Sequence, residues 1–320
     1  MGDIMKILVT GGRGFLGSYI IAELLKNDYE VIEVDNDSKS GKESISKLYD
    51  CSKVDHYKFD VSEREKLVNI MNGIDVVISG AALVGGIKYF HDYPFDIINL
   101  NNLSLLSVIN AAIKHNVKQF ILISSSMVYE RATKFPVKEG DELEMPPPVS
   151  SYGFQKLCSE YIVKVAKLQY GLDYTIVRPF NAVGFGEIIK EPGFAHVMPD
   201  LILKIKKGLP IEIFGDGQQI RCFTHARDIA KGIALCVNNE NAVNNDFNFV
   251  NENPIKIIDL AKLISKKLRS EEKFSCTNSL PFKDDVRIRD GAFDKASSIL
   301  GWIPQITLLE MIDELIQELT

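Results

Sequence analysis

The sequence MKILVTGGRGFLG, residues 5–17, decides the fold that this chain is expected to adopt. It joins a short apolar run, residues 6–10, to a cluster of glycines and then to an amphipathic stretch, residues 18–26. The glycines are Gly11, Gly12, Gly14 and Gly17. A strand, a tight glycine turn and a helix start let the backbone approach a pyrophosphate at the helix N-terminus. The stretch therefore predicts a dinucleotide-binding unit.

The next apolar run, residues 30–34, supports this interpretation because it ends at Asp35. An acidic side chain at this place accepts hydrogen bonds from the ribose hydroxyls of NAD and repels the 2′-phosphate of NADP. Arg13, within the glycine turn, favours the opposite choice because its charge would attract that phosphate. Asp35 outweighs Arg13 in our interpretation, and we expect NAD.

The overall composition is that of an ordinary globular protein, with 320 residues of which 46% are hydrophobic and 25% charged. A net charge of −6 argues against a nucleic-acid partner. The five cysteines are scattered without a CxxC pair, which predicts neither disulfides nor a metal site and indicates a reducing cytoplasm. No run approaches the roughly 18 apolar residues of a membrane span, and the first strand begins too early to leave room for a signal peptide.

Strand and helix patterns alternate through the first 180 residues. Apolar runs predict further strands at residues 56–59, 74–79, 117–123 and 174–178. Helical periodicity predicts helices at residues 63–71, 95–115 and 151–170. This alternation is typical of a doubly wound, mostly parallel α/β sheet of the Rossmann type.

From residue 181 onward, Gly, Pro and aromatic residues interrupt short elements, which predicts a smaller mixed lobe. Helices are expected at residues 197–207, 228–237, 257–268 and 308–319, with a late strand at 247–250. We assign residues 1–180 to an NAD-binding domain, to which residues 223–256 return, and residues 181–222 and 257–320 to a substrate-binding lobe.

Tyr152 and Lys156 carry the expected chemistry, because they are four residues apart and share one face of a helix. Tyrosine is a poor base at its usual pKa near 10, and a neighbouring lysine cation would lower that pKa. Ser125, in the serine turn after the fourth strand, is placed to share the proton of a substrate alcohol. The three residues predict removal of a proton from an alcohol while hydride leaves its carbon for NAD. A second pair of the same spacing, Tyr49 and Lys53, has no such serine turn before it.

Three further positions suggest contacts with the cofactor. Asp60, at the end of a strand, either accepts from the adenine amino group or caps the next helix. Small residues, Ala81 and Ala82, follow the next strand, where a cofactor would pass close to the backbone. Asn101 lies inside a predicted helix, where asparagine is unfavourable unless it has a role, with an amide that is solvated or bonded back to its own helix as the alternative.

Over nearly its whole length the chain resembles the extended short-chain dehydrogenase/reductase family, and within it the NAD-dependent nucleotide-sugar epimerases and dehydratases. The matching pieces are TGGRGFLG at 10–17, Asp35, Asp60 with Val61, Ala81 with Ala82, Asn101, the Ser125 turn before VY, YGFQK at 152–156, RPFN at 178–181, FGDGQQIRCFTHARDIA at 214–230 and LGWIP at 300–304. The resemblance implies that Ser125, Tyr152 and Lys156 are catalytic. It also implies a homodimer built on the helices near residues 95–115 and 152–170.

The resemblance further implies two sets of binding residues. The NAD contacts are expected at Gly11, Gly14, Phe15, Leu16, Gly17, Asp35, Asn36, Asp60, Val61, Ala81, Ala82, Asn101, Tyr152 and Lys156. The contacts with a nucleotide-diphosphate sugar are expected at Ser125, Ser126, Asn181, His196, Val197, Arg221 and Arg287.

Departures from the family pattern narrow the activity. Similar 4,6-dehydratases carry Thr-Asp-Glu where this chain has Ser125-Ser126-Met127, and methionine is neither acid nor base. Relatives that epimerise beside the ketone carry cysteine at the position of Met127, so this reaction is disfavoured too. His196 resembles the other acid of such enzymes, with an ordinary lobe histidine as the alternative. The family's second diphosphate arginine is missing, and Arg287 or Arg289 is expected to replace it.

We therefore expect oxidation at C4 of a nucleotide-activated sugar. Return of hydride to the other face gives a 4-epimerase, whereas release of the ketone gives a 4-dehydrogenase. A reductase that uses NADPH on a 4-keto sugar and a non-catalytic dinucleotide sensor are alternatives from other classes. The sequence does not determine the base or the sugar.

Overall fold

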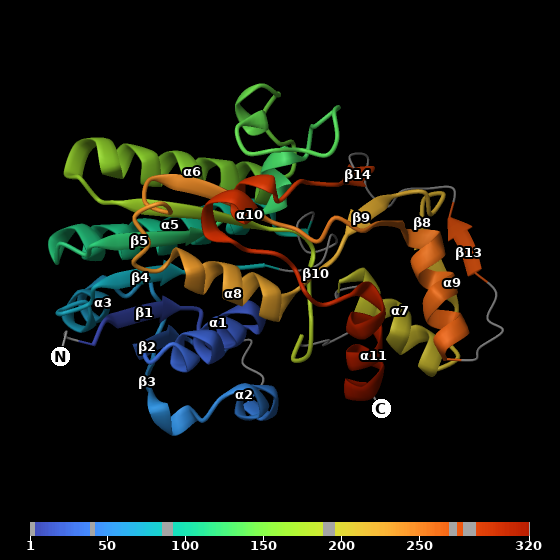
Figure 1. The fold of residues 1–320 in the computed structure, drawn as a ribbon, viewed down its shortest axis with the longest axis horizontal. Helices are drawn as coiled ribbons and strands as arrows, with labels where there is room; N and C mark the ends of the chain where they lie inside the picture. The colour runs from blue at the N-terminus through green and yellow to red at the C-terminus, as the bar shows by residue number, and fades with distance from the viewer. Residues whose placement is uncertain are drawn as a thin grey trace.

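The computed structural model describes residues 4–38, 42–84, 92–187, 196–268, 274–277 and 286–319. A seven-stranded sheet of order β11-β6-β5-β4-β1-β2-β3 forms its centre, and neighbouring strands run parallel (Figure 1). The strands are β1 (Lys6–Thr10), β2 (Glu30–Asp35), β3 (Val54–Lys58), β4 (Val76–Ser79), β5 (Gln119–Ile123), β6 (Tyr174–Pro179) and β11 (Asn245–Phe249). The predicted doubly wound parallel sheet is confirmed.

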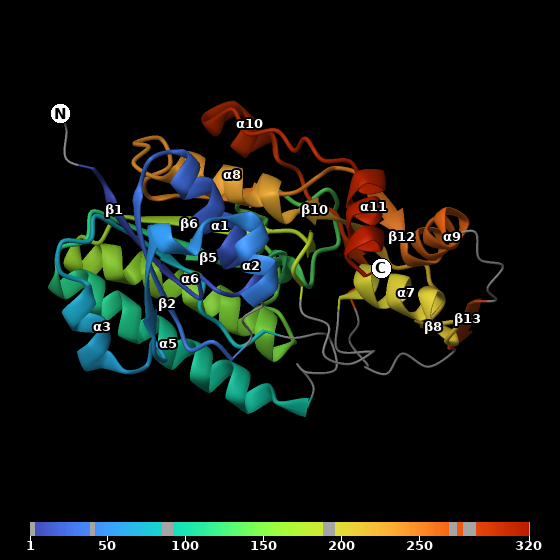
Figure 2. The ribbon, with the colours of Figure 1, turned by 90° about the horizontal axis from the view of Figure 1, so that it is seen from below.

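Helices cover both faces of this sheet (Figure 2). One layer contains α3 (Arg64–Ile70), α5 (Pro94–Lys114) and α6 (Ser151–Tyr170), and the other contains α1 (Phe15–Lys26) and α8 (Ala226–Cys236), with α2 (Lys42–Leu48) and α10 (Asp294–Leu300) beside them. Successive side chains of each strand point to opposite faces of the sheet, so each strand packs against both helix layers. In β1, Ile7 and Val9 pack in the core of α1 and α8, whereas Leu8 packs in the core of α3, α5 and α6.

The predicted helix at residues 18–26 begins earlier, at Phe15, because the glycine turn runs directly into it. Residues 36–55, which lack a clear pattern, contain the helix α2 and a 3-10 turn, Cys51–Lys53. Helix α5 is apolar and long enough to cross a membrane by length and composition alone, with 44% of its most apolar window buried. It packs against α3 and α6, and the core helix of a soluble protein passes the same test.

The C-terminal elements lie beyond the carboxyl ends of the sheet strands (Figure 1). They are α7 (Val197–Lys206), α9 (Ile257–Lys267), α11 (Leu308–Glu318), β7 (Ala182–Val183), β8 (Ile211–Phe214), β9 (Ile220–Cys222), β10 (Thr224–His225), β12 (Pro254–Lys256), β13 (Phe274–Thr277) and β14 (Ile288–Arg289). The three helices close a separate apolar core. Strand β9 pairs antiparallel with β12 and parallel with β14, so the predicted mixed lobe is confirmed.

The chain leaves the sheet after β6 and returns to it through α8 and β11. Strand β11 pairs with β6, and α8 packs on α1. Sheet and lobe therefore face each other along the edge where parallel strands end, which is where open α/β sheets place their ligands.

Candidate active site

The glycine turn after β1 is shaped for close backbone packing. Gly11 has φ of +72°, and a Cβ added there would lie 2.9 Å from the backbone of Ala81. A Cβ on Gly17 would lie 2.1 Å from the Gly11 carbonyl oxygen, so α1 begins directly on the turn. Gly14 is the N-cap of α1 and provides no capping side chain. This leaves the first N–H groups of the helix available to an anion, and the turn fits the pyrophosphate of a dinucleotide.

Polar side chains gather where β2 and β3 end. The Asp35 carboxylate accepts hydrogen bonds from the backbone N–H groups of Arg13, at 3.0 Å, and Asp37, at 2.8 Å. Burial raises the pKa of Asp35 above its usual range. Asp60 accepts from the Asn36 amide at 3.0 Å and from both the backbone and hydroxyl of Ser62. The three predicted residues Asp35, Asn36 and Asp60 thus lie in one group, and Asp60 also fixes the turn that follows β3.

Asn101 holds the segment that follows β4. Its side chain is buried within α5, accepts from the Leu83 N–H at 2.6 Å and donates to the Leu83 carbonyl at 3.1 Å. The alternative of a solvated or back-bonded amide is therefore wrong. Because Leu83 follows Ala81 and Ala82, Asn101 helps to position these two small residues, of which Ala81 lies against the glycine turn.

Ser125, Tyr152 and Lys156 come together at the carboxyl end of β5. Ser125 caps the 3-10 turn Ser126–Tyr129 by accepting from the Met127 N–H at 3.2 Å, and its hydroxyl is hydrogen-bonded to Tyr152. Helix α6 supplies the other two residues. The Lys156 ammonium donates to the Ile123 carbonyl at 2.8 Å and lies 5.8 Å from the centre of the Tyr152 ring.

Burial dominates the electrostatics of this triad. It raises the pKa of Tyr152, while the hydrogen bond with Ser125 and the charge of Arg289 oppose the rise. It also lowers the pKa of Lys156 to about 8, against the opposing charge of Glu160. In the ligand-free protein Tyr152 is therefore protonated, and its use as a base requires added positive charge close to the ring.

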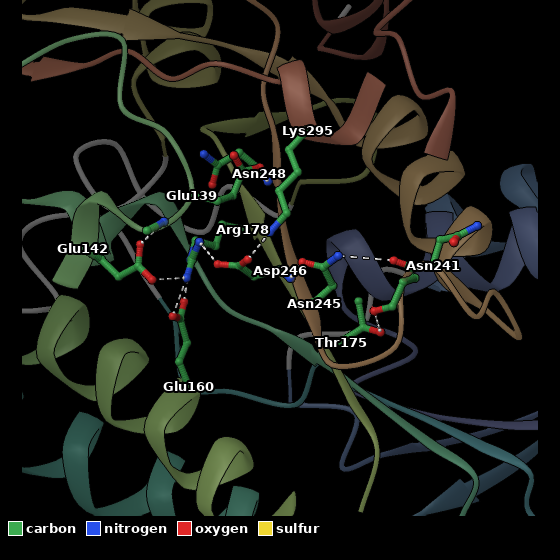
Figure 3. Close-up of polar contacts among 12 residues, drawn as sticks. Glu139, Glu142, Glu160, Thr175, Arg178, Asn241, Asn245, Asp246, Asn248 and Lys295 are labelled. Carbon is green, nitrogen blue, oxygen red and sulfur yellow. Dashed lines mark hydrogen bonds and ion pairs between the residues drawn. The ribbon is translucent and has the colours of Figure 1, made fainter. Parts of the chain in front are cut away.

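A buried ion-pair network surrounds Arg178 (Figure 3). Arg178 is 0% exposed, and its guanidinium reaches Glu160 at 2.8 Å, Glu142 at 2.9 Å and Asp246 at 2.7 Å. Glu160 lies one helical turn after Lys156 and accepts from the Ser124 hydroxyl at 2.5 Å. The network thus ties β5, α6, β6 and β11 together beside the catalytic residues. The sequence analysis missed Glu160, although its spacing from Lys156 places both on one face of the helix.

Two arginines of the lobe lie side by side. Strand β14 pairs with β9 so that Arg289 is opposite Arg221, and Arg289 donates to the Asn181 side chain at 3.4 Å. Arg287 instead forms a bidentate ion pair with Asp216, at 2.9 and 3.1 Å, and both side chains are more than half exposed. Of the two expected replacements for the missing arginine, Arg289 lies opposite Arg221 and bonds Asn181 with its side chain, whereas Arg287 meets Arg221 through its backbone carbonyl and directs its guanidinium to Asp216.

The remaining predicted residues belong to the turn after β5 and to the start of α7. Ser126, Met127 and Arg289 line a small cavity, and Met127 is buried in contact with the apolar cluster that contains Tyr152. His196 is half exposed at the start of α7, with Nδ1 2.6 Å from a carboxylate oxygen of Glu187.

Val197 begins helix α7 and packs against the lobe core. Within the described residues there is no group of three or more His, Cys, Asp or Glu side chains that could hold a metal ion.

A doubly wound sheet with this glycine turn, beside Ser125, Tyr152 and Lys156, is the arrangement of the extended short-chain dehydrogenase/reductase class. The chain belongs to the NAD dependent epimerase/dehydratase family, whose model matches residues 7–249. The predicted family, enzyme class and cofactor are therefore confirmed.

Similar proteins act on UDP-sugars, according to their names. The chain is 29% identical to a putative UDP-glucose 4-epimerase of Methanocaldococcus jannaschii, over 97% of each chain. It is 25% identical to UDP-glucuronic acid decarboxylase 1 of Arabidopsis thaliana, over 98% of this chain and 69% of that relative. The crystal structure of UDP-glucose 4-epimerase from Thermotoga maritima with UDP-glucose superposes with a TM-score of 0.86, at 28% identity and 98% coverage of both chains.

Proposed function

We propose that the protein is a 4-epimerase of a nucleotide-diphosphate sugar, acting through a 4-keto sugar. The observation that carries the proposal is the contact between Ser125 and Tyr152 beside Lys156, at the edge of the sheet where the glycine turn also lies. The names of the similar proteins support a UDP-sugar as the substrate.

In this mechanism, Tyr152 as phenolate takes the proton of the 4-hydroxyl group, and Ser125 holds that oxygen by a hydrogen bond. Bound NAD⁺ supplies the chemistry of accepting hydride from C4 and returning it. Lys156 places an ammonium group 5.8 Å from the centre of the Tyr152 ring, and the charge of Arg289 also lowers the pKa of Tyr152. Burial of the triad excludes water and so strengthens these charge effects.

We assign the diphosphate of the substrate to Arg221, Arg289 and Asn181. Guanidinium groups bind phosphate oxygens through paired, charge-assisted hydrogen bonds, and two arginines opposite each other in neighbouring strands suit a diphosphate. Arg289 then replaces the family's second arginine, and Arg287 remains a surface residue paired with Asp216.

Two other outcomes share the same first step. Release of the ketone makes the enzyme a 4-dehydrogenase. A uronic acid oxidised at C4 is a β-keto acid that loses carbon dioxide, and similarity to a UDP-glucuronic acid decarboxylase favours this as the second candidate. Buried Met127 supports neither dehydration nor epimerisation beside the ketone, since its side chain transfers no proton.

The test is proton NMR of the purified enzyme with UDP-, GDP-, dTDP- and CDP-sugars in deuterated water. We expect a new isomer at C4 without deuterium uptake and without added cofactor. A pentose product from UDP-glucuronate would identify the decarboxylase instead, and a stoichiometric ketone the dehydrogenase. Deuterium at C3 or C5 of a hexose product, or a 6-deoxy-4-ketone, would contradict our interpretation of Met127, whereas a pentose made by loss of carbon dioxide takes up deuterium at C5 in any case.

The matched control is Tyr152→Phe, which removes one oxygen from a buried ring. We expect turnover to fall by about 10³-fold or more, with the bound dinucleotide retained. Appreciable activity of this variant would overturn the assignment of the base.

A further inference from the structure

We propose that Glu33 makes the enzyme selective for NAD, because it holds the guanidinium of Arg13 and keeps that charge away from a 2′-phosphate. This inference rests on the dinucleotide site described above, although not on which sugar the enzyme uses.

Arg13 lies against the carboxylate that is expected to bind the ribose. It is placed within the glycine turn, and its backbone N–H donates to Asp35 at 3.0 Å. A long cationic side chain at this place is within reach of a phosphate on the 2′-oxygen. By position alone, Arg13 would therefore favour NADP.

The structure gives Arg13 a different partner. Its Nε donates to a Glu33 carboxylate oxygen at 2.9 Å, and its Nη1 lies 3.9 Å from Asp37. The Arg13 side chain is only 17% exposed, so the guanidinium lies mostly covered against these carboxylates. The guanidinium of Arg13 is thus held by Glu33 and Asp37 before a dinucleotide binds.

Glu33 is built into the sheet and is not a flexible surface group. It precedes Asp35 by two residues on β2, so both side chains point to one face, and Glu33 is 1% exposed. Its second carboxylate oxygen accepts from the Tyr49 hydroxyl at 3.2 Å, and His56 Nδ1 lies 3.2 Å from the first. A buried carboxylate is stable only with such partners, and Arg13 supplies the opposite charge.

The glycine turn is fitted to this carboxylate. A Cβ added at Gly12 would lie 2.8 Å from Glu33 Cβ and 2.9 Å from its carboxylate oxygen. Gly12 therefore makes room for Glu33 directly beneath Arg13. Residue 12 must therefore be glycine for Glu33 to fit, whatever the dinucleotide itself requires of the turn.

The charges around Arg13 exclude a doubly negative phosphate. Glu33, Asp35 and Asp37 place three carboxylates next to one arginine, and Lys58 lies 3.2 Å from Asp37. A 2′-phosphate would have to separate Arg13 from Glu33 and leave that buried carboxylate without its cation. The uncharged 2′-hydroxyl of NAD can bind without separating Arg13 from Glu33.

The experiment measures equilibrium binding of NADH and NADPH to Glu33→Gln, which keeps the shape of the side chain and removes its charge. We expect NADPH affinity to rise at least tenfold relative to NADH affinity. Tyr49→Phe is the matched control, since it removes one hydrogen bond to Glu33 and leaves both charges. We expect this control to keep the native ratio of the two affinities.

Arg13→Ala tests whether the gain in NADPH affinity of Glu33→Gln comes from the released arginine. In the native background this variant should leave the affinity ratio within about threefold, because Glu33 already occupies the guanidinium. In the Glu33→Gln background it should abolish the gain in NADPH affinity, whereas a general loosening of the site would let the gain persist.

An unchanged ratio in Glu33→Gln would overturn the proposal. A large loss of NADPH affinity in Arg13→Ala alone would also do so, and this second result decides the matter even when Glu33→Gln does not fold. Both measurements use binding and not turnover, so they stay valid when no sugar nucleotide is converted.

Discussion

At the scale of single residues, Lys156 combines its proposed catalytic role with a cost in stability. It lies among buried groups, and burial lowers the pKa of its ammonium to about 8, well below that of an unfolded chain. At neutral pH the folded protein must therefore keep a charge in surroundings that disfavour it. A buried charge that lowers stability is expected where a residue is kept for its function.

We predict that Lys156→Met abolishes turnover and raises the free energy of unfolding by about 1–3 kcal/mol at pH 7. The lowered pKa means that the native lysine destabilises the fold most below pH 8, and that this penalty disappears as the pH rises toward 10.5. Urea unfolding of both proteins at pH 7 and pH 10 measures the effect. A gain that does not shrink at high pH would contradict the electrostatic explanation.

The residues predicted from the sequence are those that stand in local motifs. Ser125, Tyr152 and Asp35 were predicted from a serine turn, a helical spacing and a strand end, which are all local signals. Glu33 and Glu160 were missed because their partners, Arg13 and Arg178, are 20 and 18 residues away and become neighbours only in the folded sheet. The choice between Arg287 and Arg289 likewise depended on which one pairs with Arg221 across two strands.

At the scale of elements, the Arg178 network joins the strands that end near the triad. One guanidinium on β6 neutralises carboxylates from α6, β11 and the 3-10 turn Asp141–Leu143 (Figure 3). Burial opposes the charge of Asp246, yet Arg178 and Lys295 together hold the pKa of that carboxyl below its usual range. Loss of the arginine would leave these buried carboxylates without their main cation.

We predict that Arg178→Met lowers the free energy of unfolding by about 3–5 kcal/mol at pH 7. The penalty should shrink as the pH falls toward 4, because carboxylates that have lost their partner take up protons. Lys295→Met is the control, since it removes a partly exposed cation from the same Asp246 and should cost no more than about 1 kcal/mol. Equal penalties in chemical denaturation would show that the burial of Arg178 is unimportant.

At the scale of the whole molecule, the neighbouring helices α5 and α6 present apolar residues to solvent. On α6 these are Phe154, Tyr161, Val165 and Leu168, which recur at helical spacing along one side. On α5 they include Phe95, Leu100, Leu103 and Leu106. An apolar face that spans two packed helices suits a second copy of the chain, as the family resemblance implies.

We predict a homodimer through this face, and predict that Leu168→Glu makes it monomeric. Leu168 is 86% exposed in the single chain, so the new charge disturbs no core and acts only at an interface. Ile303→Glu, on an exposed apolar residue outside these helices, should leave the dimer intact. Light scattering after size exclusion measures both, and a Leu168→Glu protein of native mass would place the interface elsewhere.

The fold as a whole was predictable because periodicity and glycine turns are short-range signals. The bounds of helix α2 could not be predicted because residues 36–55 are polar and lack a clear period. The short lobe strands were missed because runs of two to four residues show no reliable period, and these strands form by pairing with distant segments such as β9.

The return of the chain to the sheet through α8 and β11 has a consequence for synthesis on the ribosome. Strand β6 pairs with β11, which is made about seventy residues later, after the first part of the lobe. Until then the growing chain carries an open strand edge and an α1 surface without α8, which are the features that recruit chaperones or start aggregation. The nucleotide-binding half of this enzyme therefore becomes a finished folding unit only when three quarters of the protein has left the ribosome.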